Sequence, residues 1–383
     1  MLSTALVWIR NDLRVRDHAP LRYAADHYDQ VIPVYCFDPR HFGTTMFDLP
    51  KMSSIRARFL RESVQDLRDS VQDLGADLVV RRGRPEDILP ELVRQTGANE
   101  VLQFQEIGGE EEDVETAVED ALRDTGATPG FFWGKTLYHI DDVPFDGPDD
   151  IPKVYTNFRK AVEKKSTVRP TLDAPDSLLP LPEDLNPGSI PTLDELGFDD
   201  DGTVDERGVL PFRGGESRGH DRIDEYIWRG DFLKKYKATR NGLLGANYSA
   251  KFSAWLAHGC ITPRQIHEEV ERYEDQRVDN KSTYWMKFEL IWRDFFSYVT
   301  WKAGERLFRP GGINGNDIDW RYYDKSFERW AAGTTGIPFV DANMRELNRT
   351  GYMSNRGRQN VASMLSQSLK LDWRMGAAYF ESR

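Results

Sequence analysis

The chain has 383 residues, a length typical of two or three domains. Hydrophobic residues make up 39% of it and both signs of charge are mixed, which excludes wholesale disorder. Its two cysteines, Cys36 and Cys260, exclude a disulfide framework and a cysteine-rich zinc site. No apolar run reaches the roughly 20 residues of a membrane helix, and the first residues lack the features of a signal peptide. We therefore expect a soluble cytoplasmic protein.

The formal net charge of −12 is unevenly distributed. Acidic residues dominate residues 1–215, whereas residues 216–383 carry more basic than acidic side chains and most of the tryptophans. An acidic first part beside a basic, aromatic-rich second part indicates two separate tasks.

Residues 1–139 alternate strand and helix patterns. The clearest helix covers 53–74, where apolar residues recur at helical spacing. The alternation predicts a doubly wound parallel α/β sheet. The first strand is followed by WIRNDLRVRDH rather than by a glycine-rich phosphate loop, which disfavours a dinucleotide dehydrogenase. Short apolar, β-branched runs predict the buried strands at 4–9, 31–36, 77–81 and 100–104.

Residues 140–215 differ in composition from the rest of the chain. Proline and acidic residues crowd this stretch, which predicts a long connector without regular structure. From about residue 216 onward the pattern becomes helical, so residues 216–383 are expected to form an all-α domain.

The helix expected over 284–301 carries an aromatic stripe. Spacing alone favours a core helix in which Glu289 and Arg293 form an i,i+4 ion pair. The functional alternative is an aromatic wall with a carboxylate beside it, facing a flat ligand such as a base or a flavin. The stripe consists of Trp285, Phe288, Trp292, Phe295 and Val299.

The segment 247–253, NYSAKFS, follows a turn-rich approach in the helical part. Its hydroxyls, backbone N–H groups and lysine suit a phosphate at a helix N-terminus. The alternative is an ordinary capped helix start, for which Ser249 is the expected N-cap.

The segment 350–374 contains Asn355, Arg356 and Arg358 and no acidic residue before Asp372. Arginine and asparagine suit phosphates and base edges, which favours an anionic partner; a solvated polar helix start is the alternative. The seven histidines show no metal-ligand spacing, and no serine lies in a GxSxG context. We therefore expect neither a metal site nor an α/β-hydrolase.

Taken together, seven stretches in order along the chain resemble the photolyase/cryptochrome family, and most closely its DASH cryptochrome branch. They are WIRNDLRVRDHAPL, LPKMSSIRARFLRESVQDLR, FFWGKTLYHIDDVPF, ATRNGLLGANYSAKFSAWLAHGCITPRQI, STYWMKFELIWRDFF, TTGIPFVDANMRELNRTGYMSNRGRQNVAS and LDWRMGAAYFES. The resemblance implies an α/β antenna domain over 1–139, an interdomain linker over 140–215 and an all-α FAD-binding domain over 216–383.

The resemblance also assigns roles to residues. The FAD-binding set would be Tyr236, Ser249, Ala250, Lys251, Phe252, Ser253, Arg293 and Arg358. The pocket for a pyrimidine dimer would include Glu289, Trp292 and Asn355, and the DNA phosphates would contact Arg240 and Arg356. A folate antenna, 5,10-methenyltetrahydrofolate, would lie at Gln105 and Glu106. The middle and outer members of a tryptophan relay to the flavin would be Trp373 and Trp330.

The resemblance implies a monomer that uses FAD and blue light to split cyclobutane pyrimidine dimers in DNA, preferentially in single strands. The alternatives are a blue-light photoreceptor without repair activity and a flavin-free DNA-binding relic. Family members continue past YFES, so we expect this sequence to be truncated within the FAD-binding domain. Because the tryptophan nearest the flavin lies in that later segment, we expect slow or absent flavin photoreduction in the chain as it stands.

Overall fold

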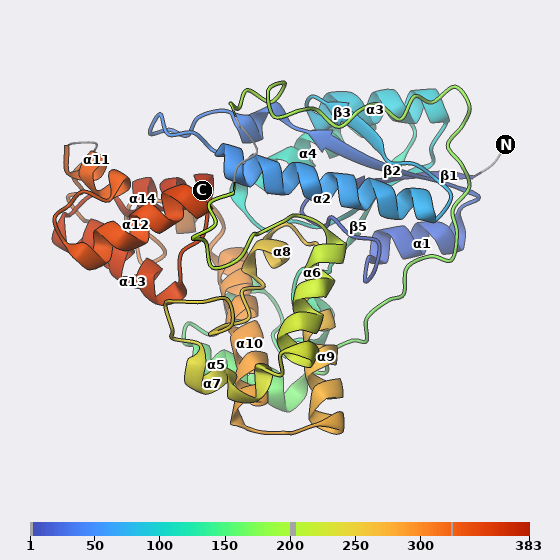
Figure 1. Ribbon diagram of the computed structural model, residues 1–383. Helices are drawn as coiled ribbons and strands as arrows, with labels where there is room; N and C mark the ends of the chain where they lie inside the picture. Colours follow the sequence, from blue (N-terminus) through green and yellow to red (C-terminus); the bar gives the residue numbers. More distant parts are fainter. Residues whose placement is uncertain (1–2, 200–203, 323–324) are drawn as a thin grey trace.

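The computed structural model describes residues 3–199, 204–322 and 325–383; residues 200–203 of the expected connector lie outside this description. Figure 1 shows an α/β part that contains the sheet and helices α1 to α4, with two groups of helices beside it. One group contains α5 to α10, and the other contains α11 to α14.

Five parallel strands form one sheet in the order β3-β2-β1-β4-β5. Every residue of β1 and β2 is buried, as expected for strands covered on both faces. The predicted parallel α/β sheet is confirmed, and the structure adds β5, whose Pro129 and Gly130 hide the strand pattern at the sheet edge. The strands are β1 (Thr4–Ile9), β2 (Gln30–Phe37), β3 (Val79–Arg82), β4 (Glu100–Phe104) and β5 (Thr128–Phe132).

Helices cover both faces of this sheet. Leu21 of α1 and Leu67 of α2 pack into one core, whereas Leu92 of α3 and Val118 of α4 pack into a second core on the other face. Ser53 caps α2 by accepting a hydrogen bond from the Arg56 amide, which places the helix start one residue after the predicted position. The four helices are α1 (Ala19–His27), α2 (Ser54–Asp73), α3 (Pro85–Thr96) and α4 (Gly109–Leu122).

The expected connector is not wholly irregular. It contains α5 (Tyr155–Lys165), which packs against α10, so the expectation of no regular structure over 140–215 is wrong there. Helix α5 forms because its apolar residues face the core and its lysines lie in the last turn. Beyond α5 the chain runs back along the sheet, where Pro187 O accepts a 2.7 Å hydrogen bond from Val80 N of β3.

The second group of helices shares its hydrophobic core with one face of the sheet. Residues of α6, α9 and α10, such as Ile223, Ile266 and Phe295, belong to the same core as Leu21 and Leu67. This continuity fixes the helices against the α/β part. They are α6 (Glu216–Ile223), α7 (Tyr236–Thr239), α8 (Ser253–Ala257), α9 (Pro263–Gln276) and α10 (Lys281–Ala303).

The last four helices form a lobe with its own core, at the left of Figure 1. Trp330 and Met344 are fully buried in it. The expected all-α character of residues 216–383 is confirmed for the described residues, apart from one isolated bridge between Arg321 and Leu371. The helices are α11 (Lys325–Ala332), α12 (Pro338–Thr350), α13 (Asn355–Ser363) and α14 (Trp373–Ser382).

Candidate functional site

A buried arginine organises the loop of residues 246–252. Arg222 of α6 is only 3% exposed. Its guanidinium donates to the carbonyl oxygens of Ala250 (2.9 Å), Ala246 (3.0 Å) and Ser249 (3.3 Å). Its charge is balanced by Glu225 at 2.9 Å. The loop therefore turns its carbonyl oxygens toward a cation.

The amide groups of the same loop are left open. In the part of the chain that the structure describes, the backbone N–H groups of residues 247–252 donate no hydrogen bond. Lys251 adopts a left-handed conformation with φ of 58°, and successive amides in such a turn form a concave anion-binding surface. Amides without protein partners are available to an anion, so this loop suits a ligand with phosphate groups.

Lys251 does not extend into that concave surface. Its Nζ donates to Ala246 O at 2.9 Å and lies 3.4 Å from the centre of the Tyr248 ring. Burial lowers the pKa of Lys251 to about 7. The hydroxyl groups of Tyr248 and Tyr352 form a 2.8 Å hydrogen bond, which connects the loop to the segment before α13. In this arrangement Lys251 supports the loop from within.

The expectation that Ser249 caps the following helix is wrong. Helix α8 begins at Ser253, its N-cap position is Phe252, and no side chain caps it. The helix has only five residues, so its dipole is small. The loop amides therefore contribute more to an anion site than the helix does. Ala250 and Phe252 of the loop are buried, as is Tyr236 of α7, and Ser253 is exposed.

Glu289 and the two expected DNA contacts lie close together. The Arg240 guanidinium is 2.7 Å from Glu289 Oε1. Asn241, the next residue, accepts a 2.9 Å hydrogen bond from Arg356 Nη2. Burial raises the pKa of Glu289, and the neighbouring Arg240 opposes this shift. A carboxylate and two cations from three separate segments thus form one polar cluster.

The remaining expected pocket residues are neighbours of this cluster in sequence, since Trp292 lies three residues after Glu289 and Asn355 directly precedes Arg356. Trp292 follows Glu289 on α10 and stacks on Tyr155, with ring centroids 3.6 Å apart and an interplanar angle of 8°. Asn355 is exposed at the first turn of α13. Arg358, one turn later, is exposed, and its guanidinium makes no hydrogen bond or ion pair with the residues that the structure describes.

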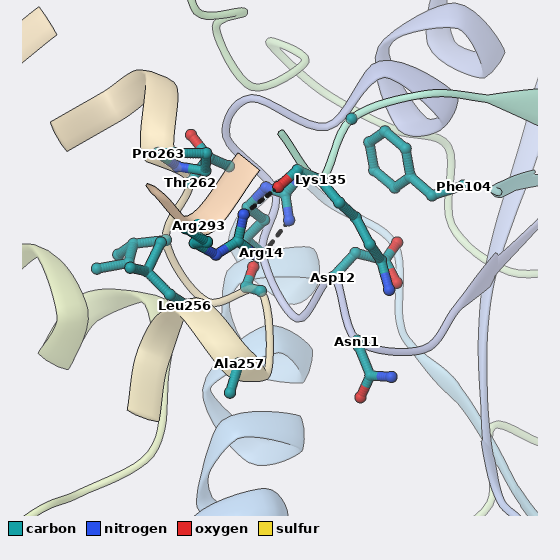
Figure 2. A pocket seen from close by; sticks show the side chains of 13 residues that line it. Asn11, Asp12, Arg14, Phe104, Lys135, Leu256, Ala257, Thr262, Pro263 and Arg293 are labelled. Atoms are coloured by element: carbon teal, nitrogen blue, oxygen red, sulfur yellow. Dashed lines mark hydrogen bonds between the residues drawn. The ribbon is translucent and has the colours of Figure 1, made fainter. Parts of the chain in front are cut away.

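Arg293 faces the α/β part. Its Nη1 donates to the carbonyl oxygen of Lys135, and Figure 2 shows it beside Arg14 at a small cavity of 90 Å³ between the two parts. Sequence reasoning placed Arg293 among the flavin contacts. The structure gives it a contact with the loop after β5, which nothing in its local sequence indicates.

A larger cavity of 310 Å³ opens at the carboxyl ends of β1 and β2, where doubly wound sheets bind ligands. Glu106 lines it and pairs with Lys135, whereas Gln105 is exposed and does not line it. The other carboxylate oxygen of Glu106, Oε1, is buried with no hydrogen-bond partner among the described residues. A ligand that presents an N–H donor at this point would satisfy that oxygen.

The expected tryptophan relay is partly wrong. Trp330 cannot be the outer member because it is fully buried and donates its indole N–H to Val361 O at 2.9 Å. Trp373 is half-buried and donates to Pro310 O at 3.1 Å. Trp320 donates to the same oxygen at 2.9 Å and is partly exposed. Sequence reasoning missed Trp320, since the acceptor that it shares with Trp373 is brought to both indoles only by the fold.

No helix among the described residues is long and apolar enough to cross a membrane. The same residues contain no group of three or more histidine, cysteine, aspartate or glutamate side chains that is suited to a metal ion.

A parallel sheet with a cavity at its carboxyl ends is joined to a helical part that carries a loop with open amides. Comparison with known proteins gives the family. The sequence profile of DNA photolyase matches residues 5–178, and that of the FAD binding domain of DNA photolyase matches residues 285–383. The chain belongs to the photolyase/cryptochrome family.

Its relatives include proteins named cryptochrome DASH. The chain is 52% identical over 381 residues to the one from Gloeobacter violaceus, covering 100% of this chain and 76% of the relative. It is also 52% identical to the one from Natronomonas pharaonis, covering 80% of that protein.

Solved structures agree with this assignment. The Synechocystis cryptochrome has a TM-score of 0.95 and 47% identity, over 99% of this chain and 78% of that chain. The class III photolyase from Agrobacterium tumefaciens has a TM-score of 0.84 and 27% identity, over 100% of this chain and 76% of that chain. The FAD-binding domain supports FAD as a cofactor.

Proposed function

We propose that this protein binds FAD and uses blue light to split cyclobutane pyrimidine dimers, preferentially in single-stranded DNA. The observation that carries the proposal is the polar cluster of Glu289, Arg240 and Arg356 beside Trp292. The carboxylate, whose pKa is raised, suits hydrogen bonding to the two linked bases of a dimer, and the aromatic ring suits stacking on them. The arginines suit the phosphates of the DNA.

The loop of residues 246–252 would hold the phosphates of FAD. Its open amides supply the donors, and Arg222 keeps the loop in that shape from behind. Tyr236, Ser253 and the guanidinium of Arg358 would complete the binding surface. Trp320 and Trp373 are the proposed outer and middle members of the electron relay. When bound, the flavin supplies the light-driven electron transfer.

Glu289 would accept hydrogen bonds from the dimer, or donate one when protonated, since its raised pKa favours retention of a proton. Trp292 would contact the bases with the part of its ring that Tyr155 leaves uncovered. The dimer must leave the base stack to reach this pocket, and that costs least in a single strand. Arg240 and Arg356 would bind the flanking phosphates.

The cavity at Glu106 would hold the antenna, for which 5,10-methenyltetrahydrofolate is the proposed ligand. Its amino and ring N–H groups match the unpaired Oε1 of Glu106. A monomer in the cytoplasm is the proposed state of the protein.

The test is light-dependent repair by the purified chain loaded with reduced FAD. An oligonucleotide with one dimer is supplied as a single strand or as a duplex, and restored pyrimidines are measured by chromatography after blue light or darkness. Repair in the light, faster on the single strand, is expected. Retention of FAD with no repair of either substrate would contradict the proposal and favour a photoreceptor without repair activity. A chain that binds DNA but no FAD would favour the flavin-free relic.

A further inference from the structure

The loop of residues 133–138 follows β5 and lies against α10. Asp294 of α10 is fully buried. Its two carboxylate oxygens accept hydrogen bonds from the backbone N–H groups of Leu137 at 2.8 Å and Tyr138 at 2.9 Å. One side chain thus binds two successive amides of the other domain.

Neighbouring residues of α10 strengthen this contact. Arg293 donates to Lys135 O, as Figure 2 shows. One turn after Asp294, the Tyr298 hydroxyl donates to Tyr138 O at 3.0 Å. Trp133, at the start of the loop, stacks on the Tyr298 ring at 5.9 Å. The loop is therefore bound to α10 along its whole length.

The loop also contacts a residue that lines the cavity at the carboxyl ends of the strands. Lys135 forms an ion pair with the buried Glu106, which lines that cavity. A continuous series of contacts therefore joins Asp294 to Glu106 through the loop. The same helix carries Glu289 five residues before Asp294 and Trp292 two residues before it.

We propose that Asp294 is a positioning residue for the antenna cavity. Its carboxylate fixes residues 133–138 on α10 and thereby holds Lys135 against Glu106. The proposal rests on the proposed function, in which a folate bound at Glu106 passes excitation energy to a flavin beside α10. Because such transfer depends steeply on distance and orientation, a rigid connection between the two sites sets its efficiency.

Three variants separate this role from a general effect on stability. Asp294→Ala removes both hydrogen bonds, whereas Asp294→Asn retains the side-chain volume and one acceptor oxygen. The control is Ser297→Ala on the same helix, since the only hydrogen bond of the Ser297 hydroxyl among the described residues goes to Arg293 O of its own helix, at 3.2 Å. Circular dichroism identifies variants that fold.

The first measurement is hydrogen exchange of the loop amides, which needs no cofactor. The amides of Leu137 and Tyr138 should exchange about tenfold faster in Asp294→Ala and less so in Asp294→Asn. The control should match the wild type. Unchanged exchange in folded Asp294 variants would overturn the proposal.

The second measurement is the binding of 5,10-methenyltetrahydrofolate, followed by its absorbance. We expect about tenfold weaker binding in Asp294→Ala. Repair driven by light that the flavin absorbs directly should be unchanged, while repair driven through the folate band should fall. Faster exchange with unchanged folate affinity and unchanged sensitised repair would overturn the link to the antenna.

Failure of the proposed function gives a different result. A wild-type chain that repairs nothing but binds folate contradicts only the repair activity, and the exchange and folate measurements still decide the role of Asp294. A wild-type chain that binds no folate would overturn the antenna assignment and the ligand part of this proposal.

Discussion

The loops at 246–252 and 133–138 differ in how their backbone N–H and C=O groups are hydrogen-bonded. In the first, carbonyl oxygens point to Arg222 and the amides have no partner within the described chain. In the second, Asp294 binds two amides while Arg293 and Tyr298 bind two carbonyl oxygens. Open donors indicate a loop that binds a ligand, and satisfied groups indicate a loop that holds other parts in place.

The largest expected effect comes from Arg222→Met. It removes a buried cation that binds three carbonyl oxygens, so the loop loses its shape, and we expect FAD affinity to fall about 100-fold and stability by ~3 kcal/mol. Flavin fluorescence titration and urea unfolding measure both. Arg218→Gln on α6 is the control, because Arg218 is exposed and its guanidinium pairs only with Asp221, at 3.5 Å, among the residues that the structure describes. Equal FAD affinities in the two variants would show that the loop does not depend on Arg222.

A comparison of ligands tests the open amides directly. FAD should bind roughly 30-fold more tightly than riboflavin, because riboflavin lacks the phosphates and a charged hydrogen bond to a phosphate contributes about 1.5–3 kcal/mol. Isothermal titration with both ligands checks this. If riboflavin bound as tightly as FAD, the loop of residues 246–252 would not be a phosphate site.

Asp294→Asn should change the dependence of stability on pH. Burial raises the pKa of Asp294 to about 7 from 3.8. Between these values the folded state holds a proton that the unfolded state has released, so wild-type stability should fall, relative to the variant, as pH rises from about 4 to 7. We expect at least a tenfold change in the ratio of the two unfolding constants, measured by urea titration at several pH values. A ratio independent of pH would contradict the raised pKa.

Lys251→Met should show a smaller effect at higher pH. Burial lowers the pKa of Lys251 to about 7 from 10.5, so the folded state has lost a proton that the unfolded state keeps. The wild type should gain stability relative to the variant as pH rises from about 7 to 10. We expect a few-fold change in the ratio of unfolding constants. If the wild type instead lost stability relative to the variant as pH rises, an acidic group near Lys251 would have to compensate for the burial of its charge.

The fold was predicted well where local patterns are strong. The β-branched runs of β1 and β2 and the apolar spacing of α2 identified these elements to within about a residue. The pattern failed at β5, where Pro129 and Gly130 interrupt it, and at α5, which a proline-rich neighbourhood conceals.

The sequence predicted which residues belong to the candidate site better than it predicted the contacts between them. Sequence motifs indicated Glu289, Arg240 and Arg356, but their assembly depends on segments far apart in the chain. The positions of the tryptophans in the sequence do not show which of them are exposed, so Trp330 was assigned to the outer end of the relay although it is buried. Arg222 and Asp294 carried no local signal because their partners are backbone atoms of other segments.

The stretch after α5 has a consequence for how the molecule behaves at high concentration. β3 is an outer strand of the sheet, and an outer strand with free backbone groups invites pairing with another chain. Val80 N already donates to Pro187 O, and proline has no N–H with which to continue a ladder. Gly188 makes the close approach possible, since a Cβ there would lie 2.3 Å from Val80 O. The proline-rich segment thus shields the β3 edge of the sheet from edge-to-edge aggregation.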